Sequence, residues 1–165
     1  MEIIIHDKDL FQFHKNWMLV QCVSADLEMG AGIATEFNRR YDVKNRARAM
    51  YPNGFHNKLG NIGGFFLRAR NEKEPDIYCL VTKNRYFDKP TYKTMQLALK
   101  QMCVDYLLTD VAKYGLIAMP AIGCGLDQLN INRVIQQLVD IFLTTNIQID
   151  LCVPGLVGID PKYLN

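Results

Sequence analysis

The sequence has no apolar run that could cross a membrane. A spanning helix needs about 20 consecutive apolar residues, and every apolar stretch of this chain is shorter. The first residues, MEIIIHDKDLF, include acidic side chains and lack both the basic start and the small-residue cleavage site of a secretory signal. We therefore expect no membrane association and a cytoplasmic location.

The cysteines have neither the spacing of a zinc site nor that of a disulfide framework. None of the five forms a C-x-x-C pair, and several lie inside apolar runs typical of strands. Free thiols are usual in the reducing interior of cells, so we expect reduced cysteines and no metal site. The cysteines are Cys22, Cys79, Cys103, Cys124 and Cys152.

Two common nucleotide-binding motifs are also missing. The chain has no G-x-x-x-x-G-K-[ST], so Walker-type nucleotide hydrolysis is not indicated. The stretch GAGIAT begins like the dinucleotide fingerprint G-x-G-x-x-G, but it ends on Thr35, and no acidic residue closes a second strand at the expected distance of about 20 residues. A nicotinamide oxidoreductase is therefore poorly supported, and we expect no cofactor.

The charge of the chain is nearly balanced but unevenly placed. A net charge of +2 is too small to indicate nucleic-acid binding by itself. Residues 39–48, RRYDVKNRAR, nevertheless carry five basic side chains against the single acidic Asp42. This stretch is either a solvated helix face or a basic rim that attracts an anionic or nucleic-acid-linked substrate.

What the chain does contain is an alternation of strand-like and helix-like segments. Its 165 residues suit one domain, and no repeat, linker or low-complexity tract divides them, so we expect a single domain over 1–165. The alternation predicts an α/β sandwich with a largely parallel central sheet. Strands are predicted at 2–6, 17–23, 65–70, 76–82, 115–120 and 147–153, with 65–70 at an edge, and helices at 32–41, 90–111 and 130–145.

Polar and glycine-rich segments follow several of these strands, and ligands bind at the carboxyl ends of strands in open α/β sheets. SADLEMGAGIA follows one strand, Lys83 follows another, and AIGCGLD, which ends on Asp127, follows a third. Glycine loops that lead into helices suit phosphate, because the backbone turns tightly and its N–H groups point at the oxygens. Two such loops on one edge predict a site for a diphosphate.

Taken together, the motifs CVSADLEMGAGIA, YCLVTKNRYFDKPTY and MPAIGCGLDQL resemble the macro domain family. The resemblance is greatest to its branch of terminal ADP-ribose glycohydrolases and ADP-ribose 1″-phosphate phosphatases, and it runs from about DKDLF to the last strand. It implies a three-layer α/β/α sandwich with a mixed sheet, and ADP-ribose as the ligand.

The resemblance also implies roles for single residues. Lys83 matches the lysine that attacks the anomeric carbon in the glycohydrolases, and Asp127 matches their catalytic acidic residue. Asp9 matches the residue that accepts a hydrogen bond from the adenine amino group, and the adenine is expected to pack on Val153 or Pro154. The implied substrate-binding residues are Asp9, Leu10, Ser24, Ala25, Asp26, Met29, Gly30, Ala31, Gly32, Ile33, Ala34, Thr82, Pro120, Ala121, Ile122, Gly123, Cys124, Gly125, Leu126 and Pro154.

The chemistry of these side chains is consistent with such roles. A lysine attacks carbon only as the neutral amine, and an adjacent carboxylate can accept the proton. The alternative is that Lys83 and Asp127 form an ordinary ion pair at the rim. Cys124 is expected to be a packed thiol that lines its loop rather than a nucleophile. Tyr86 and Phe87 contact the substrate, close the mouth of the site or pack against the long helix, and the sequence does not distinguish these three possibilities.

We therefore expect a monomeric hydrolase that removes terminal ADP-ribose from acidic protein side chains or nucleobases through a lysine adduct. Its partners would be ADP-ribose and ADP-ribosylated protein or nucleic acid. Two alternatives stay open, namely dephosphorylation of ADP-ribose 1″-phosphate and a reader that binds ADP-ribose without turnover. The presence of both Lys83 and Asp127 favours an enzyme, because a reader needs neither.

Overall fold

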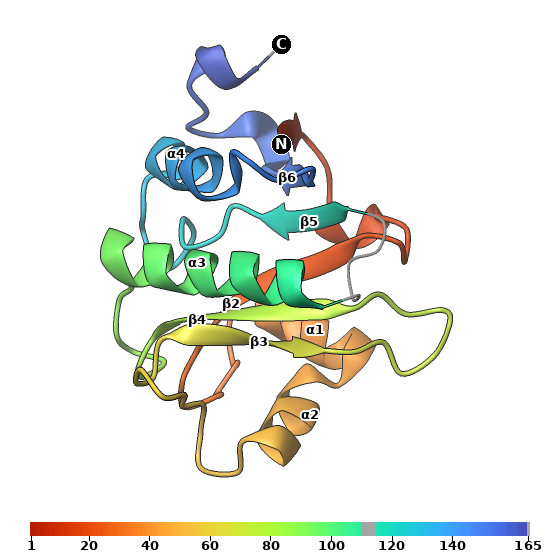
Figure 1. Ribbon diagram of the computed structural model, residues 1–165, viewed down its shortest axis with the longest axis vertical. Coiled ribbons are helices and arrows are strands. Elements are labelled where there is room, and N and C mark those ends of the chain that lie inside the picture. Colours follow the sequence, from red (N-terminus) through yellow and green to blue (C-terminus); the bar gives the residue numbers. More distant parts are fainter. Residues whose placement is uncertain (110–114, 165) are drawn as a thin grey trace.

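The computed structural model describes residues 1–109 and 115–164, and within them it forms one mixed sheet between helices. The strand order is β1-β6-β5-β2-β4-β3 (Figure 1). All neighbouring strands pair in parallel except β3 and β4, which are antiparallel. This confirms a largely parallel sheet with an edge strand at β3. The strands are β1 Glu2–His6, β2 Met18–Ser24, β3 Gly63–Leu67, β4 Ile77–Lys83, β5 Leu116–Pro120 and β6 Gln148–Cys152.

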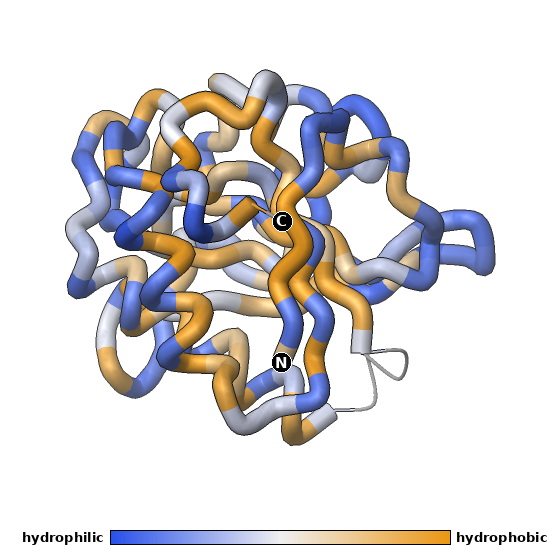
Figure 2. The backbone as a smooth tube through the Cα atoms, turned by 90° about the horizontal axis from the view of Figure 1, so that it is seen from above, coloured by the Kyte–Doolittle hydropathy of each residue, from blue (hydrophilic) through white to orange (hydrophobic). Residues whose placement is uncertain are grey.

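Helices cover both faces of the sheet and make the molecule three layers thick (Figure 1). Helices α3 and α4 pack with one buried cluster of side chains, and α1 and α2 pack with a second cluster on the opposite face. The central strands contribute to both, since Leu80 of β4 faces the first cluster and its neighbour Val81 the second. In Figure 2 hydrophobic segments run through the middle of the molecule. The helices are α1 Ile33–Tyr41, α2 Val43–Met50, α3 Tyr92–Leu108 and α4 Ile131–Phe142.

Side-chain caps determine where the two long helices begin. Thr91 and Thr94 form a reciprocal capping box at the start of α3. Asn130 caps α4 by accepting hydrogen bonds from two backbone N–H groups in its first turn. The helix predicted at 90–111 is confirmed as far as Leu108, and its end at 110–111 lies outside the described residues.

One predicted helix needs correction, and the structure favours one of the two interpretations of the basic stretch. The helix predicted at 130–145 ends earlier, at Phe142, because the backbone N–H and the hydroxyl of Thr145 both donate to the Phe142 carbonyl and close a turn. The basic stretch 39–48 is shared between α1 and α2, and Asp42 separates them in the left-handed conformation with φ 53°. Many of its charges are paired on the surface, since Arg39 and Arg40 bind Glu36. This favours the interpretation of the stretch as a solvated helix face.

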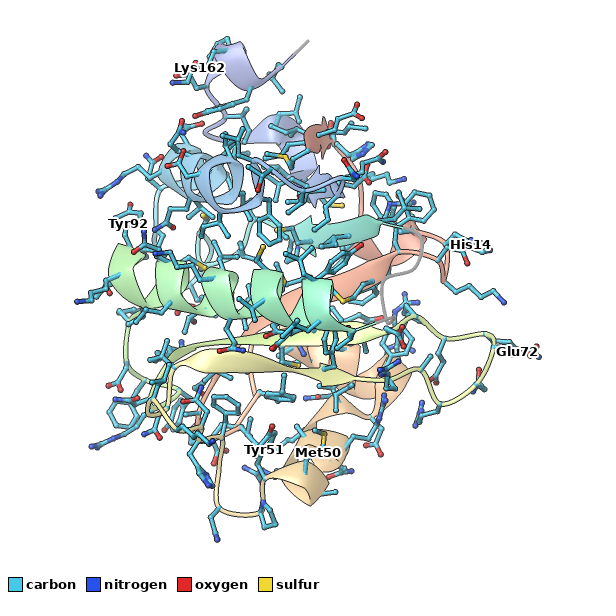
Figure 3. All side chains as sticks on the ribbon, in the orientation of Figure 1. His14, Met50, Tyr51, Glu72, Tyr92 and Lys162 are labelled. Carbon is cyan, nitrogen blue, oxygen red and sulfur yellow. The ribbon has the colours of Figure 1, made fainter. Side chains whose placement is uncertain are left out.

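One aromatic residue brings the starts of α3 and α4 together. Tyr92 begins α3 (Figure 3), and its hydroxyl accepts a hydrogen bond from the backbone N–H of Asn130 at 2.9 Å. The guanidinium of Arg133 lies 3.6 Å from the centre of the Tyr92 ring, and Gln137 donates to the Tyr92 carbonyl at 2.7 Å. The first turn of α4, which leads out of the second glycine loop, is thereby held against α3. None of the helices in the described ranges is long and apolar enough to span a membrane.

The end of α4 offers a test of the packing. Phe142 is fully buried, whereas its neighbour Leu143 is 63% exposed. We expect Phe142→Ala to lower the free energy of unfolding by about 3–5 kcal/mol, because it removes buried apolar area and leaves a cavity. Leu143→Ala should change it by no more than about 0.5 kcal/mol. Urea denaturation of both variants measures the difference, and equal effects would mean that α4 does not pack as described.

Candidate active site

A cavity of about 1330 Å³ opens at the carboxyl ends of β2, β4, β5 and β6. This is the edge of the sheet where open α/β folds bind their ligands. The two glycine-rich loops and the segment after β6 form most of its wall. The cavity reaches across four neighbouring strands, from β4 to β6. Because neighbouring strands lie about 4.8 Å apart, it extends over roughly 14 Å.

Lys83 and Asp127 meet at the β4 end of this cavity. Lys83 is the last residue of β4, and Asp127 lies in the loop between β5 and α4. The lysine Nζ donates to Asp127 Oδ1 at 2.7 Å, and each side chain is only 15% exposed. Lys83 and Asp127 lie far apart in the sequence. Their contact therefore depends on the parallel sheet, which places the ends of β4 and β5 on one edge. The pair is therefore a partly buried ion pair that faces the cavity.

The first glycine loop is held in an unusual backbone conformation. Leu27 and Met29 have φ values of 57° and 46°, and Gly32 has 63°. A positive φ is unfavourable for residues other than glycine and persists only where surrounding contacts enforce it. Leu27 is fully buried, and the amide of Asn38 in α1 donates to the Met29 carbonyl at 2.9 Å. These contacts fix the loop at the point where it enters α1.

The two glycines of the second loop differ in what surrounds them. At Gly123, with φ 71°, an added Cβ would lie 2.7 Å from Met95 Cε and 2.9 Å from a methyl group of Leu129. Gly123 thus allows the loop to turn against the core. At Gly125 an added Cβ would have no neighbour within 4 Å. Both residues line the cavity, but only Gly125 has free space in the direction of a side chain.

The two loops approach each other over the cavity. An added Cβ at Gly32 would lie 3.8 Å from Leu126 Cδ1, so the Leu126 side chain reaches the first loop. The carbonyl of Leu126 accepts a hydrogen bond from Lys89 Nζ at 2.6 Å, although the Leu126 side chain is 67% exposed. Lys89 therefore holds the second loop and adds a positive charge to the cavity wall.

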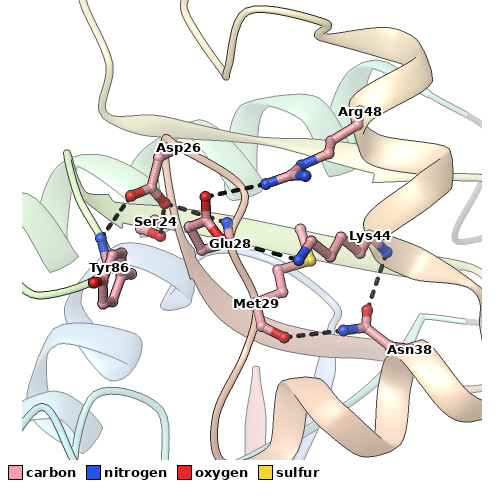
Figure 4. A network of polar contacts seen from close by, with 8 residues as sticks. All are labelled: Ser24, Asp26, Glu28, Met29, Asn38, Lys44, Arg48 and Tyr86. Carbon is pink, nitrogen blue, oxygen red and sulfur yellow. Dashed lines mark hydrogen bonds and ion pairs between the residues drawn. The ribbon is translucent and has the colours of Figure 1, made fainter.

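Asp26 connects the first loop to the segment after Lys83 (Figure 4). Its carboxylate accepts hydrogen bonds from the Ser24 hydroxyl, from the Tyr86 backbone N–H at 2.8 Å and from the Glu28 backbone N–H at 3.2 Å. Figure 4 also shows Arg48 of α2 directed at Glu28, with a distance of 3.2 Å between their side chains. The Asp26 carboxylate is thus engaged in fixing backbone, and it does not line the large cavity.

Most of the sequence-predicted residues line the cavity. They are Ser24, Met29, Gly30, Ala31, Gly32, Ile33, Ala34, Lys83, Pro120, Ala121, Ile122, Gly123, Cys124, Gly125, Leu126, Asp127 and Pro154. Their binding and catalytic roles stay predictions that the experiments below test.

Five of the predicted residues do not line the cavity: Asp9, Leu10, Ala25, Asp26 and Thr82. Leu10, Ala25 and Thr82 are buried in the protein interior. Asp9 is exposed after β1, and one of its carboxylate oxygens accepts a hydrogen bond from the backbone N–H of Phe11 at 2.9 Å. It nevertheless lies beside the β6 end of the site, because it follows β1, and His6 at the end of β1 pairs in register with Cys152 of β6.

Several cavity residues were not anticipated from the sequence. They include Cys22, Glu28, Lys89, Cys152, Val157 and Gly158. The strand period gives a signal for Cys22, which lies two residues before Ser24 and so on the same face of β2. Lys89 belongs to the KPTY motif. No comparable signal marks Val157 and Gly158, which reach the cavity only through the path of the chain after β6.

Comparisons with known proteins agree with this geometry. The human protein named ADP-ribose glycohydrolase OARD1 is 34% identical over 145 residues, which is 86% of this chain and 84% of the human one. The solved macrodomain of Thermus aquaticus DarG superposes with a TM-score of 0.74 at 17% identity, covering 91% of this chain and 97% of that one. No protein-family model matches the sequence.

This chain belongs to the macro domain family. A further solved structure, titled as Thermosipho africanus DarTG in complex with ADP-ribose, superposes with a TM-score of 0.77 at 16% identity. It covers 99% of this chain and 44% of that longer one. The macro domain fold confirms the three-layer α/β/α sandwich that the sequence motifs indicated.

The thiols of Cys22 and Cys124 line the same cavity as the Lys83–Asp127 pair of this macro domain, but their surroundings suppress the thiolate form. Burial raises the pKa of Cys124 to about 11. Burial, together with the charges of Asp127 and Cys124, raises the pKa of Cys22 even further. The thiolate is the nucleophilic form, so neither thiol suits catalysis near neutral pH. Among the described residues, no group of three or more His, Cys, Asp and Glu side chains could hold a metal ion.

The raised pKa of Cys124 predicts slow alkylation. At pH 8 it leaves about 200-fold less thiolate than an ordinary cysteine with a pKa of about 8.5. We expect iodoacetamide to modify Cys124 far more slowly in the folded protein than in an unfolded peptide of the same sequence. The rate should rise as the pH approaches 11. Peptide mass spectrometry measures both, and equal rates at pH 8 would contradict this assignment.

Proposed function

We propose that this macro domain is an ADP-ribose glycohydrolase that cleaves the bond between the distal ribose of ADP-ribose and an acceptor group. The Lys83–Asp127 contact of 2.7 Å at one end of a long cavity is the observation that carries the proposal. The relatives support it, since the human one is named as such an enzyme and a structural neighbour was solved with ADP-ribose.

The cavity suits an elongated ligand that has an anionic group in its middle and a different group at each end. The glycine loops lie between the β4 and β6 ends and lead towards the N-termini of α1 and α4. Helix N-termini and free backbone N–H groups favour phosphate oxygens. We therefore place the diphosphate of ADP-ribose at the loops, its distal ribose beside Lys83 and its adenosine towards β6.

The reaction follows from the chemistry of an amine beside a carboxylate. Asp127 accepts a proton, and the neutral Lys83 amine attacks the anomeric carbon of the distal ribose. A carbon–nitrogen bond forms as the bond from that carbon to the acceptor breaks, and the acceptor leaves with a proton. Water then hydrolyses the adduct, which restores the amine and releases ADP-ribose. Backbone N–H groups of the loops hold the diphosphate in place throughout.

The acceptor is either an acidic protein side chain or a nucleobase. Tyr86 and Phe87 follow Lys83 closely and are 62% and 60% exposed. Their rings meet edge to face with centres 5.3 Å apart. Tyr86 lines the cavity and Phe87 packs against the Tyr86 ring, so we assign the two rings to contact with the acceptor group. Dephosphorylation of ADP-ribose 1″-phosphate and binding without turnover are the alternatives that the next experiment separates.

Replacement of the lysine tests the mechanism. We expect Lys83→Ala to abolish release of ADP-ribose from glutamate-linked protein and from ADP-ribosylated DNA, while binding of free ADP-ribose stays measurable by calorimetry. Lys83→Arg should not restore activity, because a guanidinium stays protonated. Asp127→Ala should slow turnover, and intact-mass spectrometry can detect a lysyl–sugar adduct that accumulates.

Three outcomes would count against this mechanism. Native-rate release by Lys83→Ala would exclude a lysine nucleophile. Wild-type protein that binds ADP-ribose but turns over neither substrate would indicate a reader. Protein that acts on ADP-ribose 1″-phosphate alone would indicate a phosphatase, whose attack on phosphorus requires no lysyl–sugar adduct.

The glycine loops make a separate prediction about binding. Gly125→Val should place a branched side chain in the open space of the cavity and raise the dissociation constant of ADP-ribose at least about tenfold, equivalent to 1.4 kcal/mol. Ala49→Val adds similar bulk to an exposed position of α2 and should leave the affinity unchanged. Calorimetry measures both, and native affinity in Gly125→Val would remove this loop from the diphosphate site. Gly123→Val is a poorer test, because its side chain would collide with the core.

A further inference from the structure

A second lysine of the cavity wall, Lys89, is bonded to the loop that carries Asp127. Its Nζ donates to the carbonyl of Leu126 at 2.6 Å. That carbonyl belongs to the peptide group that joins Leu126 to Asp127. Lys89 lines the same cavity as Lys83, yet the reaction described above gives it no part. Its hydrogen bond reaches the backbone of the residue that accepts the proton.

We propose that Lys89 is a positioning residue, which holds the Leu126–Asp127 peptide so that the Asp127 carboxylate stays within reach of the Lys83 amine. The proposal rests on the proposed function, because it assumes that Asp127 accepts a proton during turnover. In this role Lys89 contacts neither the sugar nor the reacting atoms, and it acts through Asp127 alone.

The backbone on the other side of Asp127 is held by the loop itself. The N–H of Gln128 donates to the Gly125 carbonyl at 3.1 Å. Gln128 has a φ of 64°, which is unfavourable for residues other than glycine and persists only where surrounding contacts maintain it. On the near side, the Lys89 ammonium bonds the Leu126 carbonyl. Asp127 is thus held between a tight backbone turn and the end of one side chain.

The loop has little packing of its own at this point. The Leu126 side chain is 67% exposed, and an added Cβ at Gly125 would have no neighbour within 4 Å. Burial of apolar surface therefore cannot fix the loop here. A hydrogen bond from a charged donor is stronger than one between neutral groups. The Lys89 bond is suited to hold a carbonyl that packing leaves free to move.

The segment that carries Lys89 is itself ordered on both sides. Asp88 closes a turn before it, since its backbone N–H donates to the Arg85 carbonyl at 3.0 Å and its carboxylate accepts from the Arg85 N–H at 3.1 Å. After it, Pro90 is buried and Thr91 caps the start of α3. A positioning group must extend from a rigid element to hold another loop in place. The backbone of Lys89 meets this requirement.

The nucleophile and the residue that positions its proton acceptor belong to one connection. Lys83 ends β4, and Lys89 lies between β4 and α3. Lys83 binds the Asp127 carboxylate at 2.7 Å, while Lys89 binds the preceding carbonyl at 2.6 Å. A displacement of about 1 Å near reacting groups can lower a rate about 100-fold. Loss of the Lys89 bond should therefore affect the chemistry although Lys83 and Asp127 are both present.

Lys89→Met tests the proposal, with Lys100→Met as its matched control. Methionine keeps most of the apolar stem and removes the donor, and Lys100 is exposed on α3 and does not line the cavity. We expect Lys89→Met to lower kcat for ADP-ribose release from glutamate-linked protein about 10- to 100-fold. The dissociation constant of free ADP-ribose should change less than about threefold. Lys89→Arg, which can still donate to the carbonyl, should restore part of the rate.

A double-mutant cycle shows whether Lys89 acts through Asp127. Single-turnover assays with excess enzyme can follow the slow release expected of Asp127→Ala. In that background Lys89→Met should cause no further loss of rate, because the group that it positions is gone. The same fold-loss in the presence and in the absence of the Asp127 carboxylate would overturn the proposal.

The outcomes separate this proposal from the proposed function. If wild-type protein releases no ADP-ribose, the proposed function fails. If wild-type protein turns over and Lys89→Met retains the kcat of Lys100→Met, Lys89 does not position the proton acceptor. A raised dissociation constant of ADP-ribose with an unchanged kcat would assign Lys89 to ligand binding and would also overturn the proposal. Thermal unfolding of both variants checks that they fold, as expected for changes at exposed positions.

Discussion

The parallel pairing of β2 with β4 on one side and with β5 on the other is the constraint on which the site depends. It brings the carboxyl ends of these three strands to one edge of the sheet. Both glycine loops, Lys83 and Asp127 lie at that edge. The pairing extends into the loops, since the backbone N–H groups of Ala25 and Asp26 donate to the carbonyls of Lys83 and Asn84. The first loop and the segment after β4 are therefore positioned as one unit. A shift in the pairing register between β2 and β4 would therefore displace Lys83 and the first glycine loop together.

Much of the fold was predictable because its signals are local. The strands are short apolar runs, and the two long helices carry their own capping residues, Thr91 and Asn130. The separate helix α2 was not predicted, because its start depends on the left-handed conformation of Asp42. The early end of α4 likewise depends on a turn closed by Thr145, which helical periodicity does not reveal.

The sequence predicted which loops form the site, but not the direction in which each of their side chains points. Gly123 and Gly125 look equivalent in the sequence, yet one faces Met95 and the other faces open space. Asp26 follows Ser24 closely, but its carboxylate binds backbone groups that include one from the segment after β4. Val157 reaches the cavity because Asp7 and Asn132, distant in the sequence, hold the chain around it. Such contacts arise only once the fold has brought remote segments together.

The nucleophilic side chains of the cavity, two thiols and one amine, lie in different electrostatic environments. Burial raises the pKa of the Cys22 and Cys124 thiols and keeps them protonated. Lys83 lies in the same partly buried region, but its amine donates a hydrogen bond to the Asp127 carboxylate at 2.7 Å. Removing charge from water is costly unless a partner compensates it. The ion pair offsets that cost for Lys83, and in the mechanism proposed above Asp127 receives the lysine proton as the amine attacks. Under that proposal the Lys83 amine, and not a thiol, attacks the sugar carbon.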